Sequence, residues 1–119
     1  MNTIIRIEHP SDGKGIWRSN TTVYDTLSNI WEFVSRHRQF PNPTYEGDVT
    51  GFIEGIHYCA FKSIEQLQEW VYKDEIKELL ELGFKVYMLD VSNWLEGNYQ
   101  ICYKKEDILQ QKDISELFK

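Results

Sequence analysis

The sequence predicts a single α+β domain over residues 1–119, with a small mixed or antiparallel sheet, two main helices and a C-terminal hairpin. A chain of 119 residues matches one domain and can bury its own core. Its 41% apolar and 14% aromatic residues are typical of a folded chain. The expected order of elements is strand, helix, strand, helix, strand, strand and tail, which suits α+β better than a doubly wound sheet.

The first half of the chain predicts one strand and one helix. In residues 3–8 the side chains alternate, with Ile5 and Ile7 on one face and Arg6 on the other. Residues 22–37 carry an apolar stripe at helical spacing, followed by basic side chains that suit the end of a helix dipole. The stripe consists of Val23, Leu27, Ile30, Trp31 and Val34.

A loop over residues 40–52 follows this helix. Pro41 and Pro43 end the helix and stiffen the loop, which has no apolar periodicity. A rigid and aromatic loop of this kind is often functional, although a stiff connector would have the same composition.

The middle of the chain predicts a short buried strand and then an interrupted helix. Residues 56–61 form an apolar run of strand length. Ser63, with Gln66 three residues later, has the pattern of a capping box that opens a helix. The polar residues 72–75 interrupt the apolar stripe of this helix, and Gly83 supplies its C-terminal stop.

The last third predicts a hairpin and a docked tail. Residues 84–91 and 98–104 have strand patterns, and the loop over residues 92–97 between them has an apolar tip. We expect the charged tail from residue 105 to dock as a short helix or an irregular segment. Its apolar side chains are Ile108, Leu109, Ile114, Leu117 and Phe118.

The charge balance restricts the partners. The chain has 13 basic and 19 acidic side chains and a formal charge of −6. Nonspecific binding of DNA or RNA needs a basic face, so we expect no generic nucleic-acid binding. The negative charge suits a basic protein partner, or competition for a nucleic-acid groove on another protein. Solubility alone would also explain it.

The sequence indicates a cytoplasmic protein with no membrane association. No apolar leader follows Met1, and no apolar run approaches membrane-spanning length. Cys59 and Cys102 both lie in apolar, strand-like stretches. We therefore expect two reduced and buried thiols.

The sequence predicts no metal site and no strong nucleophile. His9, His37 and His57 are scattered, without the spacing of paired ligands. Cys59 would share a strand face with His57, two residues before it, but no oxyanion-hole pattern accompanies them. The preferred interpretation is a packed cysteine beside a half-buried histidine.

The candidate binding residues are large side chains in turn-rich sequence that have no periodic core stripe to join. They are Phe40, Tyr45, Trp94 and Leu95. The prolines of the first loop would lower the ordering cost of presenting its aromatics to a partner. Trp and Tyr often dominate interface energies. The alternative is that these side chains fold back as lids over the sheet edges.

Several short stretches resemble a group of small uncharacterised proteins of phages and prophages. They are residues 5–10, 15–18 and 41–43, residues 61–63 with Leu67 and Trp70, Gly83 with Phe84, and Gly97 with Gln100. The resemblance spans most of the chain. It implies an origin in a mobile element and names no activity.

A second set of residues resembles the ADP-ribosyltransferase-like fold. Arg6, Ser63 and Gln100 follow the order of that family's basic first-strand residue, its aromatic-x-Ser motif and its late-strand glutamate, with Phe61 as the aromatic. The resemblance implies NAD as cofactor and these three residues as catalytic. Gln100 departs from the pattern because it lacks the charge that steadies a cationic sugar, and Ser63 already has a role as a helix cap.

Three functions stay open. The first is a phage or prophage protein that binds a host or phage protein, inhibits a host defence protein, and uses no cofactor. The second is an ADP-ribosyltransferase-like enzyme or a nucleotide-binding protein that uses NAD. The third is a structural phage component. The uncharged Gln100 favours the first over the second.

Overall fold

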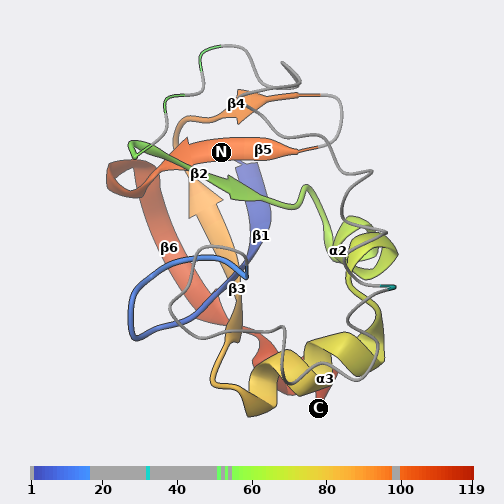
Figure 1. Cartoon of the computed structure of the whole chain (residues 1–119). Coiled ribbons are helices and arrows are strands. Elements are labelled where there is room, and N and C mark those ends of the chain that lie inside the picture. Colours follow the sequence, from blue (N-terminus) through green and yellow to red (C-terminus); the bar gives the residue numbers. More distant parts are fainter. Residues whose placement is uncertain (1, 17–31, 33–50, 52, 54, 98–99) are drawn as a thin grey trace.

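A computed structural model of the chain describes residues 2–16, 32, 51, 53, 55–97 and 100–119. Within these residues the chain forms strands, two α-helices and two 3-10 turns (Figure 1). In chain order they are β1 (Asn2–Glu8), β2 (His57–Ala60), α2 (Ile64–Trp70), α3 (Lys73–Glu81), β3 (Lys85–Val91), β4 (Leu95–Glu96), β5 (Ile101–Lys104), η1 (Lys105–Asp107), β6 (Ile108–Asp113) and η2 (Ser115–Phe118). The predicted helix over residues 22–37 and most of the predicted loop over residues 40–52 lie outside the described residues.

The strands form two three-stranded antiparallel sheets. The first sheet has the order β1-β3-β6 and the second has the order β2-β5-β4. In Figure 1 the strands of the second sheet run across the upper end of the first. A bridge between Ile5 and Phe61 connects the sheets, with two backbone hydrogen bonds of 2.9 and 2.8 Å. The predicted α+β class is therefore confirmed, and its antiparallel strands are divided between two sheets.

The C-terminal hairpin does not form between the two predicted strands, residues 84–91 and 98–104. β3 does not pair with β5; it lies between β1 and β6 in the first sheet. The hairpin forms instead between β4 and β5, with Leu95 opposite Cys102 and Glu96 opposite Ile101. Neighbours in sequence were expected to pair, but β3 aligns along its whole length with the distant β1. That long-range pairing buries apolar side chains of both strands, and local sequence patterns do not reveal it.

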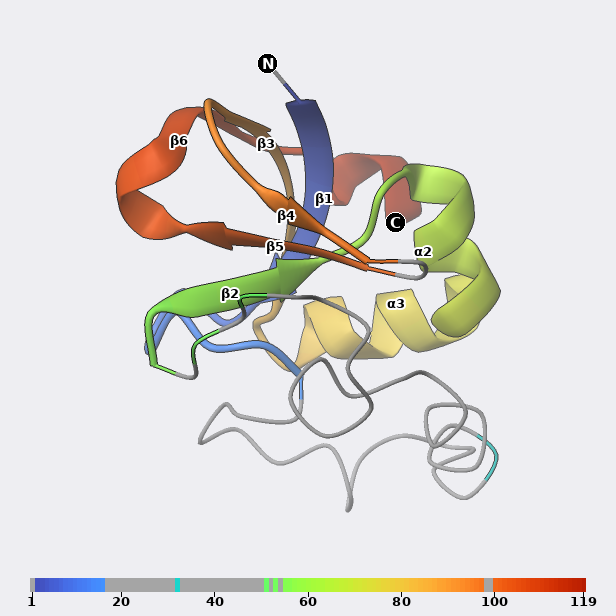
Figure 2. The same cartoon turned by 90° about the horizontal axis from the view of Figure 1, so that it is seen from above.

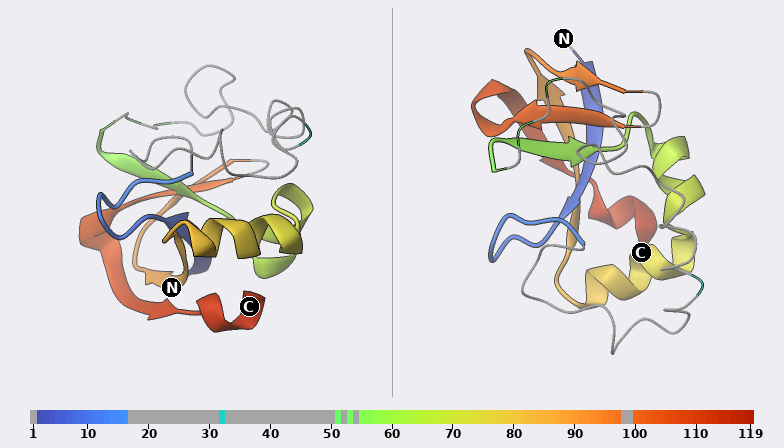
Figure 3. Two further views of the ribbon diagram at one scale, coloured as in Figure 1. Left: turned by 60° about the horizontal axis from the view of Figure 1, so that its bottom comes forward. Right: turned by 45° about the horizontal axis from the view of Figure 1, so that its top comes forward.

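The tail contains a strand that the sequence did not predict. β6 pairs with β3, although five of its six residues are exposed. An exposed edge strand lacks the apolar alternation by which strands are recognised. After β6, Ile114 and Phe118 enter the core, and the buried Ser115 Oγ accepts a hydrogen bond from the Val86 amide at 3.0 Å. Figure 3 shows η2 beside α3.

β1 lies between two hydrophobic cores. Ile5 and Ile7 belong to the first core, which includes the buried faces of α2, α3 and η2. Ile4 belongs to the second core, which lies between the two sheets. The predicted alternation of β1 is confirmed, but both of its faces are buried. Arg6 shares the face of Ile4 and is only 8% exposed.

The start of α2 at Ser63 and the stop of α3 at Gly83 agree with the predicted signals. The break between the helices is shorter than the predicted interruption over residues 72–75, because residues 73–75 already belong to α3. The Ser63 hydroxyl accepts a hydrogen bond from the Gln66 amide at 3.0 Å and caps α2. The chain leaves helical geometry at Val71, so the predicted interruption separates α2 from α3. Gly83 then follows α3 with a φ of +97°, a conformation that favours glycine.

Candidate functional site

Arg6 connects the two sheets at the centre of the molecule. Its Nη1 donates a hydrogen bond of 2.6 Å to the carbonyl of Cys59 on β2. Its Nε donates to the Glu8 carboxylate at 3.3 Å, which forms an ion pair within β1. Because the guanidinium is nearly buried, these contacts are needed to offset its loss of hydration.

An aromatic ring from the second sheet lies against this guanidinium. The Tyr58 ring lies 5.6 Å below the Arg6 guanidinium carbon, and Lys105 Nζ lies 4.9 Å from the centre of the same ring. Tyr58 and Tyr103 are register partners, with their ring centres 6.0 Å apart. Cations on aromatic faces are stabilised by the ring quadrupole. Arg6, Glu8, Tyr58, Tyr103 and Lys105 are called the sheet-junction cluster below.

The electrostatics of this cluster affect Tyr103. Burial raises the pKa of the Tyr103 hydroxyl to about 12, the positive charge of Arg6 works against this shift, and Glu8 adds to it. Tyr103 therefore stays neutral through the physiological range. The Tyr103 ring packs in the second core, and its neutral hydroxyl is not the state of a general base at neutral pH.

Two glycines let the loop after β1 approach the cluster closely. A Cβ at Gly15 would lie 3.4 Å from Arg6 Nη1, and a Cβ at Gly13 would lie 3.0 Å from Lys105 Nζ. Gly13 also has a φ of +66°. The loop therefore brings its backbone against both cations, of which Arg6 is nearly buried and Lys105 is exposed.

The three residues suggested by the transferase resemblance have structural contacts. Arg6 is hydrogen-bonded to Glu8 and Cys59, and the Ser63 hydroxyl caps α2. Gln100 is 2% exposed, at the start of β5. Nothing in their arrangement supports the resemblance to the ADP-ribosyltransferase-like fold.

The second candidate surface lies at β4, where Leu95 meets the segment before β2. A Cβ at Gly51 would lie 3.6 Å from a Leu95 methyl group, so the Leu95 side chain lies against the backbone of Gly51. In the same segment Ile53 is 52% exposed and Ile56 is 48% exposed. Leu95, Ile53 and Ile56 are called the β4 apolar surface below.

The predicted binding residues are only partly described. Trp94 is half-buried and packs against the second core, and Leu95 is half-buried on β4. Phe40 and Tyr45 lie outside the described residues. A role in binding stays a prediction for all four.

The sequence did not single out Tyr58, Lys105, Ile53 or Ile56. The two cluster residues come together only through the pairing of β2 with β5, which no local pattern encodes. For Ile53 and Ile56 a signal was present, because apolar residues around Gly51 and Gly55 are placed in turns.

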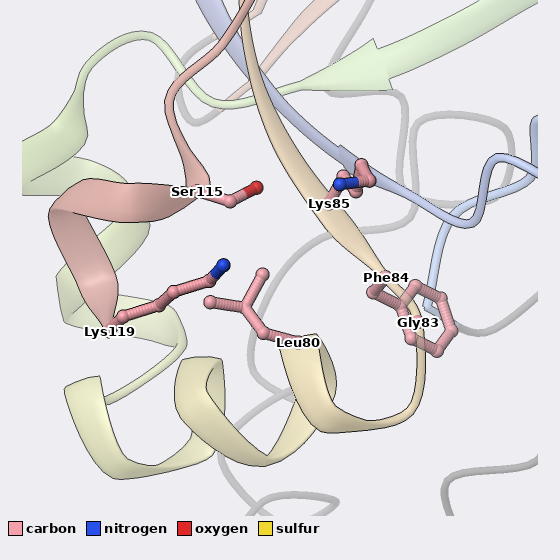
Figure 4. A pocket seen from close by; sticks show the side chains of 6 residues that line it. All are labelled: Leu80, Gly83, Phe84, Lys85, Ser115 and Lys119. Carbon is pink, nitrogen blue, oxygen red and sulfur yellow. The ribbon is translucent and has the colours of Figure 1, made fainter.

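A small cavity of about 90 Å³ lies between α3, β3 and the C-terminus (Figure 4). The two lysines at its edge are already paired, Lys85 with Asp113 at 3.2 Å and Lys119 with Glu116 at 2.8 Å. The cavity has room for only a few waters. It is lined by Leu80, Gly83, Phe84, Lys85, Ser115 and Lys119.

The described residues contain neither a metal-binding cluster nor a membrane-spanning helix. No group of three or more His, Cys, Asp or Glu side chains is placed to hold a metal ion in that part of the chain. Over the same residues, no helix is both long and apolar enough to span a membrane.

The chain is a small α+β protein built on two antiparallel sheets, and its two candidate sites are the sheet-junction cluster and the β4 apolar surface. The chain matches the family described as Bacteriophage T4 Y00F protein over residues 1–116, and it belongs to that family. Neither a curated protein nor a solved structure matches it significantly. The predicted resemblance to phage proteins is thus confirmed.

Proposed function

We propose that this phage-type protein acts by binding another protein, encoded by the host or the phage, and that it inhibits a host defence protein through this contact. The proposed site is the β4 apolar surface. The binding needs no cofactor and takes place in the cytoplasm of the infected cell. The predicted binding residues Trp94, Phe40 and Tyr45 take part in the same binding.

The observation that carries the proposal is the exposure of two large aliphatic side chains beside an edge strand. Ile53 and Ile56 each expose about half of their surface, and Gly51 brings their segment against Leu95. Ile53 and Ile56 share one turn, in which the Ile56 amide donates a hydrogen bond to the Ile53 carbonyl at 3.1 Å. Exposed apolar side chains that lie close together favour a protein interface. β4 is the edge strand of the second sheet and has only two residues.

The charge of the chain supports a basic partner. A formal charge of −6 steers association with a positively charged surface and disfavours binding to nucleic acid. The protein would inhibit its partner if the basic surface that it covers is also the surface to which the partner's own ligand binds.

The proposal is tested by affinity capture from host cells that express the tagged full-length chain. The double variant Ile53→Ser/Ile56→Ser should lower capture of the principal host protein by about tenfold or more, or about 1.4 kcal/mol. Leu117→Ser is the matched control, because Leu117 is an exposed aliphatic residue at 65% on η2. The control should capture the partner normally.

Thermal unfolding and a defence assay complete the test. Both variants should keep the unfolding midpoint, since neither change removes a buried side chain. Only the double variant should lose protection of the phage in hosts that carry the targeted defence. Equal capture by the double variant and the control would show that the β4 apolar surface is not the binding site.

A further inference from the structure

Cys59 and Cys102 face each other across the second sheet. They are register partners on the antiparallel strands β2 and β5, and their Sγ atoms lie 3.2 Å apart as thiols in contact. Figure 2 shows β2 and β5 side by side. The sequence predicts two reduced and buried thiols. The structure places them in contact and leaves Cys59 partly exposed.

The geometry of the pair is close to that of a disulfide. Directly opposed residues of antiparallel strands have Cα atoms about 4.5–5.5 Å apart, within the range that disulfides occupy. To reach a bond of about 2.05 Å the sulfurs must approach by roughly 1.2 Å. Small side-chain rotations supply such a movement without a change in strand pairing.

The two thiols differ in access to solvent. Cys59 is partly exposed, whereas Cys102 is fully buried at 0% exposure. We propose that this pair is a reversible modification site. Cys59 attacks a low-molecular-weight disulfide, and Cys102 resolves the resulting mixed disulfide to give an intramolecular disulfide. This proposal does not depend on the proposed partner.

The reaction balances as two thiol–disulfide exchanges. The Cys59 thiol loses its proton, and its sulfur attacks one sulfur of the small disulfide and releases the first small thiol. The Cys102 thiol then loses its proton, and its sulfur attacks Cys59 Sγ and releases the second small thiol. The protein loses two electrons and two protons, and the small disulfide gains them as two thiols.

The new bond would staple β2 to β5 across a long segment. The loop between the cysteines contains α2, α3, β3 and β4, and their sequence separation is 43. Closing a loop of this size restricts the unfolded chain and raises stability. Leu95 is the register partner of Cys102 on the other side of β5, so the bond would also fix the strand next to β4.

The test incubates the full-length folded chain with oxidised glutathione, followed by alkylation of remaining thiols and mass spectrometry. The wild type should lose two hydrogens, give one peptide pair linked through Cys59 and Cys102, and accumulate little mixed disulfide. Oxidation should also raise the thermal unfolding midpoint by at least about 5 °C. Dithiothreitol should reverse both changes.

Two single variants test the assigned roles. Cys102→Ser should trap one glutathione on Cys59, because the resolving thiol is missing. Cys59→Ser should stay unmodified while folded, since Cys102 is buried, and become modified in denaturant. Cys102→Ala replaces Cys102→Ser if circular dichroism shows that the serine variant does not fold.

The proposal fails if folded wild type remains a dithiol under conditions that oxidise the denatured chain. It also fails if the reaction of the wild type stops at the mixed disulfide between Cys59 and glutathione. Equal modification of Cys59→Ser and Cys102→Ser while folded would overturn the assigned roles of the two thiols.

Discussion

The turn after α3 depends on a contact between Gly83 and the ring of His9. A Cβ at Gly83 would lie 2.8 Å from His9 Nε2. The ring is fixed because its Nδ1 accepts a hydrogen bond from the Ser11 amide at 3.2 Å, which leaves Nε2 to donate to the Leu82 carbonyl at 3.1 Å. Gly83 therefore meets a requirement for space as well as for a positive φ.

We expect Gly83→Ala to lower the free energy of unfolding by about 2–4 kcal/mol, through backbone strain and displacement of the His9 ring. The matched control is Gly55→Ala, where φ is +87° but no atom lies within 4 Å of the added Cβ. It should cost only about 1–2 kcal/mol. Urea unfolding measures both, and equal losses would show that the His9 contact does not constrain the turn.

Tyr103 makes stability depend on pH in the alkaline range. Its folded pKa of about 12 lies above the ordinary value of 10.0, mainly because the ring is buried. The neutral hydroxyl is thus favoured in the folded state. Its contribution to stability is complete below pH 10.0 and is lost as the pH rises from there through about 12.

At pH about 11 this loss should reach about 1.4 kcal/mol relative to pH 8, one pKa unit being worth about 1.36 kcal/mol. Tyr103→Phe removes the titrating group, so its stability should fall less over the same interval. The measurement is urea unfolding of both proteins at the two pH values, with reductant present. The same pH dependence in both proteins would assign the loss to other groups.

At the scale of the element, α3 starts with a buried carboxylate. Glu75 is 7% exposed, and its Oε1 accepts a hydrogen bond of 2.8 Å from the Tyr72 amide. That amide is one of the donors that a helix start leaves without an intrahelical partner. The negative charge in the first turn also suits the helix dipole.

Removal of this cap should destabilise the protein. We expect Glu75→Ala to lower the free energy of unfolding by about 1–2 kcal/mol. Glu75→Gln keeps an oxygen acceptor and should lose only the charge contribution, about 0.3–1 kcal/mol. Chemical denaturation separates the two, and the cap has no role if alanine is tolerated as well as glutamine.

The sequence predicts those elements whose signals are local. The Ser63 hydroxyl marks the start of α2, and the positive φ of Gly83 marks the end of α3, so each helix has one end that a local signal predicts. β6 was missed because an exposed edge strand has no apolar alternation. The predicted pairing of β3 with the following strand was wrong. β3 pairs instead with β1, which is distant in the sequence, and local patterns do not reveal such a pairing.

For the candidate sites, too, the sequence predicts only those features that have a local signal. Leu95 and Trp94 were predicted from an apolar tip in turn-rich sequence, and their positions at β4 are described, whereas their binding role stays a prediction. The contact between Cys59 and Cys102 depends on the register of β2 with β5. A register is a property of two strands, so neither cysteine reveals it in its own sequence context.

At the scale of the whole molecule, β1 joins the two halves of the fold. Its opposite faces supply Ile5 and Ile4 to different cores, and Arg6 reaches the second sheet through the Cys59 carbonyl. A change in either core therefore acts on the strand that both cores share. This arrangement predicts a single folding unit, in agreement with the single domain expected from the length of the chain.

The test uses one truncation in each core. Leu67 lies in the first core and Leu89 in the second. Leu67→Ala and Leu89→Ala should each lower the free energy of unfolding by about 2–5 kcal/mol. Far-UV circular dichroism and tryptophan fluorescence should give the same midpoint for each variant, with reductant present. Leu117→Ala, on the exposed surface, should change the free energy by less than about 0.5 kcal/mol.

Two separate units would behave differently. Each truncation would then shift only the part of the transition that belongs to its own core, and the two probes would give different midpoints for at least one variant. Because β1 and β3 both supply side chains to the two cores, such a result would mean that neither these shared strands, nor the bridge between Ile5 and Phe61, nor the contact of Arg6 with Cys59 couples the two cores. Coincident probes in both variants require that coupling.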